Sequence, residues 1–136
     1  FLFLGAQAWD DAKQAALVAA LRARPRPVIC ANPDIVAPRE GGFTWEPGHY
    51  AFDLPVPVAF HGKPFGGAFA AALAALDLPA ARVAMVGDTL HTDVLGGRAA
   101  GCFTVLVRSH GFFQGLDPQP FVSACGLVPD FIAEGT

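Results

Sequence analysis

The stretch that decides the fold runs from residue 82 to residue 101 and reads Arg82-Val-Ala-Met-Val-Gly-Asp-Thr-Leu-His-Thr-Asp-Val-Leu-Gly-Gly-Arg-Ala-Ala-Gly101. Its apolar run, Val83 to Val86, is typical of a strand that is covered on both faces in a parallel sheet. Gly87 lets the backbone turn into a helix whose first turn contains Asp93, where the helix dipole favours negative charge. Gly101 is placed to end that helix. The stretch therefore predicts a strand, a sharp turn and a helix of an α/β fold.

Asp88 would lie just beyond the carboxyl end of this strand. Ligands of open α/β sheets bind at that edge, and two carboxylates there, Asp88 and Asp93, could hold a hard cation beside a phosphate. The alternative is purely structural, with Asp88 capping a turn and Asp93 complementing a helix N-terminus. The pattern of two acids alone does not decide between the two interpretations.

A lysine upstream of the acids supplies the missing context. Gly62-Lys63-Pro64 follows a second strand-like segment, Val56 to Phe60. A lysine at the end of a strand, followed by a rigid proline, can direct its ammonium into the same crevice as Asp88. With both features, the chain resembles the C-terminal half of the haloacid dehalogenase (HAD)-like phosphohydrolases, whose third and fourth active-site motifs are a Lys of Gly-Lys-Pro type and Gly-Asp-x4-Asp.

The resemblance extends to the subclass with a large α/β cap, which includes sugar-phosphate, glycerol-phosphate and pyridoxal-phosphate phosphatases. The segment Cys30-Ala-Asn-Pro-Asp34 matches its cap motif, so the three motifs occur in the family's order between Val28 and Ile132. The resemblance implies an α/β fold: a Rossmann-like parallel sheet with flanking helices, together with the end of an α/β cap domain. We expect residues 1–55 to be the C-terminal part of the cap and residues 56–136 the C-terminal part of the core.

The resemblance also implies roles for the residues that match the core motifs. Asp88 matches the acid that binds Mg²⁺, which prefers oxygen ligands. Lys63 matches the residue that neutralises the phosphoryl group and the aspartyl nucleophile. Asp93 matches the second acid of its motif, which we expect to contact metal-bound waters or Lys63 rather than the metal itself.

The cap motif implies a substrate-binding segment. Asn32 and Asp34 match that motif, and the loop that follows it, residues 35–42, faces the substrate in this subclass. Arg39 and Glu40 are candidates for substrate specificity, and a solvated pair of loop residues is the alternative interpretation.

The chain also departs from the family. It contains no Asp-x-Asp pair, which supplies the nucleophile in HAD phosphatases, and it begins with Phe1. We therefore expect a part of a longer enzyme that lacks the first two motifs and does not hydrolyse phosphate esters alone. The expected whole enzyme is a Mg²⁺-dependent phosphatase that acts on a small phosphorylated metabolite through a phospho-aspartate.

Two other functions remain open at this stage. A non-catalytic α/β module could bind a phosphate or a nucleotide at the same strand ends. A receiver-like signalling domain also places acids and a lysine there, but its acids should precede the lysine, whereas Lys63 precedes Asp88. The four histidines lack zinc-site spacing, and no Ser-His-Asp pattern is in register.

Composition and charge exclude further classes of function. The 136 residues carry a net charge of −3 with no basic cluster, which argues against nucleic-acid binding. No run approaches the roughly 18 apolar residues that a membrane span needs. The three cysteines are widely spaced, which indicates free thiols in a reducing compartment, so we expect a cytoplasmic protein. In the whole enzyme, the cap is a candidate homodimer surface.

The remaining elements follow from apolar periodicity, with proline and glycine as breakers. The helix expected at residues 66–76 consists almost wholly of Ala, Phe and Leu, so we expect it to be buried on most sides. Strands are expected at residues 1–4, 28–31, 56–60, 83–86, 103–107 and 129–132, and helices at residues 9–24, 48–54 and 66–76.

Overall fold

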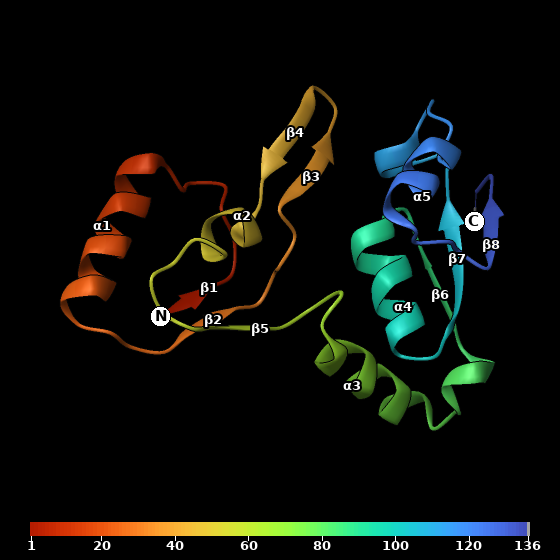
Figure 1. The fold of residues 1–136 in the computed structure, drawn as a ribbon, viewed down its shortest axis with the longest axis horizontal. Helices are drawn as coiled ribbons and strands as arrows, with labels where there is room; N and C mark the ends of the chain where they lie inside the picture. Colours follow the sequence, from red (N-terminus) through yellow and green to blue (C-terminus); the bar gives the residue numbers. More distant parts are fainter. Residues whose placement is uncertain (136) are drawn as a thin grey trace. The chain divides into compact units, whose positions relative to one another are not determined.

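Two three-stranded parallel sheets form the centres of two separate units in the computed structural model, which describes residues 1–135 (Figure 1). The first unit comprises residues 1–62, and the second begins at Lys63. The fold is α/β with flanking helices, as the sequence predicts. The strand at 58–60, which the sequence assigns to the second part, pairs with the strand at 28–30 and so lies in the first unit.

The first unit is built on the strand order β1-β2-β5. Between β1 and β2 runs α1, whose first turn is capped by Asp10, because that carboxylate accepts a hydrogen bond of 2.8 Å from the Lys13 backbone N–H. The helix ends at Ala23, and its C-cap Arg24 is extended, as expected for a residue before a proline, here Pro25. The elements are β1 (Leu2–Phe3), α1 (Asp11–Ala23), β2 (Val28–Cys30), β3 (Val36–Arg39), β4 (Gly42–Trp45), α2 (Pro47–Ala51) and β5 (Val58–Phe60).

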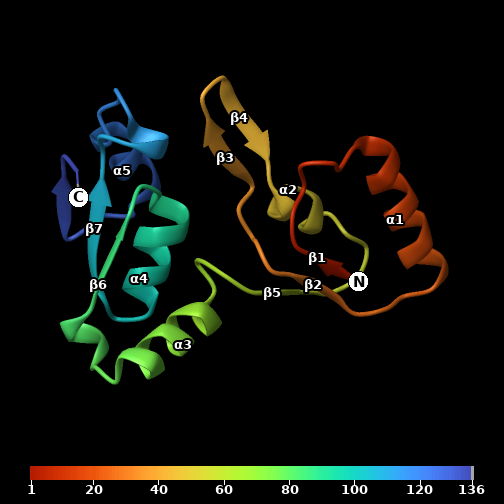
Figure 2. The same cartoon turned by 180° about the vertical axis from the view of Figure 1, so that it is seen from behind.

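An antiparallel hairpin replaces the loop expected at residues 35–42. Its strands β3 and β4 pair with Ala37 opposite Thr44 and Arg39 opposite Gly42. The hairpin projects as a separate ribbon from the unit's parallel sheet (Figure 2). Because strand side chains alternate between faces, one face carries Arg39 and Thr44, and the other carries the exposed aromatic rings of Phe43 and Trp45.

The second unit has the strand order β6-β7-β8, with every pair parallel. Asp130 fixes the start of β8, since one carboxylate oxygen accepts bonds of 2.8 Å from both the Thr104 N–H and the Thr104 hydroxyl. The Thr104 hydroxyl, more than its backbone N–H, lowers the pKa of Asp130. The elements are α3 (Gly66–Leu76), η1 (Ala80–Arg82), β6 (Ala84–Gly87), η2 (Leu90–Val94), α4 (Leu95–Ala99), β7 (Phe103–Val107), η3 (Gly111–Phe113), α5 (Gln119–Cys125) and β8 (Phe131–Ala133).

Helix α4 packs closely on both of its neighbours because it contains two adjacent glycines. A Cβ at Gly96 would overlap the ring of Phe69 in α3, and a Cβ at Gly97 would overlap Met85 in β6. The helix ends as predicted: the N–H of Gly101 bonds the Arg98 carbonyl and the N–H of Cys102 bonds the Gly97 carbonyl, which is a Schellman motif. The two glycines therefore let α4 lie directly against α3 and β6.

Two predictions of burial are wrong. Helix α3 has the predicted bounds, but only Phe69 in it is buried, and Leu76 at its end is 53% exposed. Strand β6 is covered on one face only. The helical segments η2, α4 and α5 pack on the face with Met85 and Leu106, so Val86 stays 45% exposed and Phe131 58% exposed within residues 1–135.

Candidate active site

An ion pair joins two of the predicted site residues. The ammonium of Lys63 lies 2.5 Å from Oδ1 of Asp93. The Asp93 side chain is only 2% exposed, whereas that of Lys63 is 44% exposed. Oδ2 of Asp93 accepts a hydrogen bond of 3.1 Å from the backbone N–H of Thr89. The buried carboxylate is thus satisfied on both oxygens, and the lysine head group keeps one side toward solvent.

A π-helical turn, η2, brings Asp93 into this position. The carbonyl of Thr89 accepts hydrogen bonds from the N–H groups of both Asp93 and Val94, so the turn is wider than an α-helical one. The Asp93 carboxylate folds back to the Thr89 N–H, as the acid of a capping box does. Gly87 permits this approach, since a Cβ there would lie less than 3.0 Å from the Asp93 carboxylate.

Asp88 lies directly after β6 and is half-buried. Its Oδ2 accepts a hydrogen bond of 3.1 Å from the backbone N–H of Phe112, and its Oδ1 accepts a longer one, of 3.4 Å, from the Thr89 hydroxyl. Among residues 1–135, no group of three or more His, Cys, Asp or Glu side chains could hold a metal ion together. Within the described residues, Asp88 is therefore not part of such a group of three or more ligands.

The charges at the end of β6 suit a bound phosphate ester. Lys63 and Asp93 compensate each other, and Asp88 adds one negative charge beside them. A dianionic phosphoryl group needs positive charge beside it, and the exposed side of the Lys63 ammonium can supply such charge. A cation bound by Asp88 would supply more.

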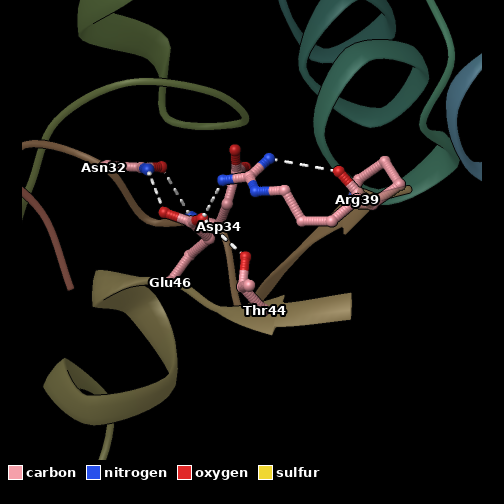
Figure 3. Close-up of polar contacts among 6 residues, drawn as sticks. Asn32, Asp34, Arg39, Thr44 and Glu46 are labelled. Carbon is pink, nitrogen blue, oxygen red and sulfur yellow. Dashed lines mark hydrogen bonds and ion pairs between the residues drawn. The ribbon is translucent and has the colours of Figure 1, made fainter. Parts of the chain in front are cut away.

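The three predicted substrate-binding residues, Asn32, Asp34 and Arg39, lie around a carboxylate that the sequence did not single out (Figure 3). Glu46 is 9% exposed. It accepts hydrogen bonds from Asn32 Nδ2 at 3.2 Å, Arg39 Nη2 at 2.9 Å and Thr44 Oγ1 at 3.3 Å. Asn32 Oδ1 also accepts a bond of 3.1 Å from the Asp34 N–H, closing a turn. Glu46 thus ties the loop after β2 to both strands of the hairpin.

A signal for this cluster does exist in the sequence. The residues from Gly42 to Glu46 alternate between small or polar and aromatic side chains, which is the period of a strand. A hairpin in that register places Arg39, Thr44 and Glu46 on one face. The glycines at 41 and 42 make the segment look like a loop when the alternation is ignored.

Removing the central carboxylate tests this cluster. Glu46→Ala is expected to lower the free energy of unfolding by about 1–3 kcal/mol, because the half-buried amide of Asn32 and the two hairpin donors lose their shared acceptor. We place the loss at the lower end, since the Arg39 side chain is 50% exposed and can be hydrated. Urea denaturation measures the loss. Glu40→Ala, at an exposed position in the same hairpin, is the control and should change stability by less than about 0.5 kcal/mol; equal effects would contradict a role for the cluster.

The cysteines form no alternative catalytic centre. Burial raises the pKa of the Cys30 thiol, which donates to the Asn32 carbonyl at 3.2 Å, so it is a protonated core group rather than a nucleophile. All three cysteines are free, as the sequence predicts, and Cys125 is the last residue of α5. No helix within residues 1–135 is long and apolar enough to span a bilayer.

Comparison with known proteins identifies the same region of the chain. The HAD-hydrolase-like family matches residues 60–123, which include Lys63, Asp88 and Asp93. An acid sugar phosphatase of Staphylococcus aureus is 38% identical over 87 residues, which are 60% of this chain and 33% of that protein.

Two solved structures match nearly the whole chain. A p-nitrophenyl phosphatase from Archaeoglobus fulgidus is 30% identical to this chain, with a TM-score of 0.78. The match covers 98% of this chain and 53% of the phosphatase chain. A possible sugar phosphatase of the HAD superfamily from Cytophaga hutchinsonii is 27% identical to this chain, with a TM-score of 0.82. That match covers 98% of this chain and 51% of the sugar phosphatase chain. The chain thus spans about half the length of these structures. In its motifs, its fold and these matches, the chain resembles the HAD-like hydrolases, and within them the C-terminal portion of the class with a large α/β cap.

Proposed function

We propose that the protein is a Mg²⁺-dependent phosphatase that hydrolyses a small phosphate ester, such as a sugar phosphate, through a phospho-aspartate. The observation that carries this proposal is the Lys63–Asp93 ion pair beside Asp88 at the carboxyl end of β6. The names of the matched phosphatases support the reaction class.

Lys63 is proposed to bind the transferred phosphoryl group. An ammonium has three N–H donors, and the ion pair with Asp93 uses one of them. Because Asp93 is buried and bonded to Thr89, it fixes the position of the ammonium while other donors remain available to phosphoryl oxygens. Such a fixed charge stabilises the transition state without reorganisation during the reaction.

Asp88 is proposed to hold the magnesium ion. Mg²⁺ sites commonly use one or two carboxylates together with waters and substrate phosphate oxygens. The half-buried carboxylate of Asp88, at a strand end, suits the role of one such ligand. The bound ion would supply Lewis-acid stabilisation of the phosphoryl oxygens. Asp93 is not assigned as a ligand, because its two oxygens bond Lys63 and Thr89.

The attacking carboxylate is not assigned to a residue of this chain. None of its aspartates stands in an Asp-x-Asp pair. The activity is therefore proposed for the full gene product that contains these 136 residues, and the test uses that product.

Substrate binding is proposed for the cap motif. Asn32 and Asp34 shape the turn that leads into the hairpin, and the half-exposed guanidinium of Arg39 offers donors to the part of the substrate that is not phosphate. Because Glu46 offsets its charge, Arg39 favours a hydroxylated group over a second anion.

We also propose a cytoplasmic location, consistent with the free thiols, and the cap as a dimer surface.

Metal removal is the direct test. The full gene product should release p-nitrophenol from p-nitrophenyl phosphate with Mg²⁺ present, and the rate should fall to background when EDTA removes the ion and recover when Mg²⁺ is returned. Release that is indifferent to EDTA would remove the metal from the proposal. Phosphate binding with no turnover would favour the non-catalytic module instead.

A further inference from the structure

The backbone of Gly111 and Phe112, in the segment after β7, packs against the carboxylate of Asp88. The N–H of Phe112 donates to Oδ2 of Asp88 at 3.1 Å. Gly111, which has a φ of 65°, lies so close that a Cβ there would be less than 3.0 Å from both Oδ2 and Cγ of Asp88. The carboxylate therefore occupies the space that any side chain at position 111 would need.

This segment is fixed in the core of its unit. Phe113, in η3, is 6% exposed and packs in one cluster with Leu90 and Val94 of η2 and Leu106 of β7. The same cluster thus anchors both the backbone over Asp88 and the turn that carries Asp93. Neither can shift without disturbing the other.

Each of the two site carboxylates has the same kind of support. Gly87 lies against Asp93 as Gly111 lies against Asp88, and each Oδ2 accepts one backbone N–H, from Thr89 and from Phe112 respectively. A backbone donor held against a carboxylate selects one orientation of that side chain. For Asp88 the donor occupies Oδ2, and within residues 1–135 Oδ1 has the longer 3.4 Å bond from the Thr89 hydroxyl.

We propose that Gly111 and the Phe112 N–H are a backbone clamp that positions Asp88 and thereby sets the protein's affinity for its divalent cation. The inference rests on the proposed function, because it takes Asp88 as a cation ligand. Gly111 is a positioning residue: it acts through Asp88 and needs no contact with substrate. Partners that orient a metal ligand typically change metal affinity by about 10–100-fold when they are altered.

Gly111→Ala in the full gene product tests the clamp, with Gly115→Ala as a matched control. Both glycines have positive φ, 65° and 76°, so alanine strains the backbone at both sites, but a Cβ at Gly115 has nothing within 4 Å. The Gly111 variant is expected to need about tenfold or more Mg²⁺ for half-maximal turnover, and Gly115→Ala less than about twofold more.

A second readout does not depend on turnover. Binding of Mn²⁺, followed by the electron paramagnetic resonance signal of the free ion, should weaken by the same factor in the Gly111 variant and not in the Gly115 variant. Equal binding by both variants would overturn the clamp and leave the proposed function standing. Absence of Mn²⁺ binding and of turnover in the wild-type protein would overturn both.

Two NMR measurements, one on the Asp88→Asn variant and one on the wild-type protein, do not need the Gly111 variant to fold. In an amide NMR spectrum, Asp88→Asn should move the Phe112 resonance upfield, since the charged acceptor is lost. Substoichiometric Mn²⁺ should broaden the Phe112 amide before that of Gly115. A Phe112 resonance that responds to neither change would contradict the clamp.

Discussion

Asp88→Asn in the full gene product is expected to lower kcat by about a thousandfold or more. The change removes the charge that is proposed to hold the metal while it preserves size and the capacity to accept a bond from Phe112. A metal ion contributes several kcal/mol of charge stabilisation in such reactions, and about 4 kcal/mol corresponds to a thousandfold in rate. Initial rates over a range of Mg²⁺ concentrations measure the loss.

The control for this variant is Asp53→Asn, the same chemical change at an exposed position of the other unit, which should leave kcat unchanged. The thermal midpoint of the Asp88 variant should stay close to that of the wild type, because its carboxylate is only half-buried. An Asp88→Asn protein with undiminished kcat would disprove the proposed role.

Lys63→Met is expected to reduce kcat by about a hundredfold or more and to destabilise the protein as well. The loss of rate reflects the missing charge on the phosphoryl group. The loss of stability, about 1–3 kcal/mol, arises because Asp93 remains buried without its cation. It falls below the value for a fully buried pair because the Lys63 side chain is 44% exposed.

A second substitution separates the two effects. In the double variant Lys63→Met with Asp93→Asn, both charges of the pair are gone, and the asparagine can still accept the Thr89 N–H. Urea denaturation should show most of the stability restored, whereas kcat should stay low. Recovery of activity together with stability would mean that Lys63 is only structural.

The segments with strong local signals were predicted well. Gly66 to Leu76 has the expected helix bounds, and Gly101 ends α4 in a left-handed conformation, because helix breakers and a C′ glycine act locally. The placement of Asp93 in a first turn was also correct, and one of its two expected partners, Lys63, is the one observed. These features depend on residues close to one another in sequence.

The features that depend on distant residues were missed. The π-helical width of η2 has no local signature, and the contact of Phe112 with Asp88 joins η3 to a residue 24 positions earlier in the chain. Burial of α3 was overestimated, because apolar composition indicates what a helix could bury and not what is present to cover it. Glu46 was overlooked because its role exists only once the hairpin has formed.

The two-faced hairpin β3–β4 constrains how this region can vary between homologous proteins. Arg39 and Thr44 share one face and Phe43 and Trp45 the other only while the present register holds. Inserting or deleting one residue at the tip, near Glu40 and Gly41, would slide one strand against the other and exchange the faces of every side chain on it. Length changes at the tip should therefore occur in pairs of residues, and a homologue with an odd change should have lost the arginine, the glutamate or both.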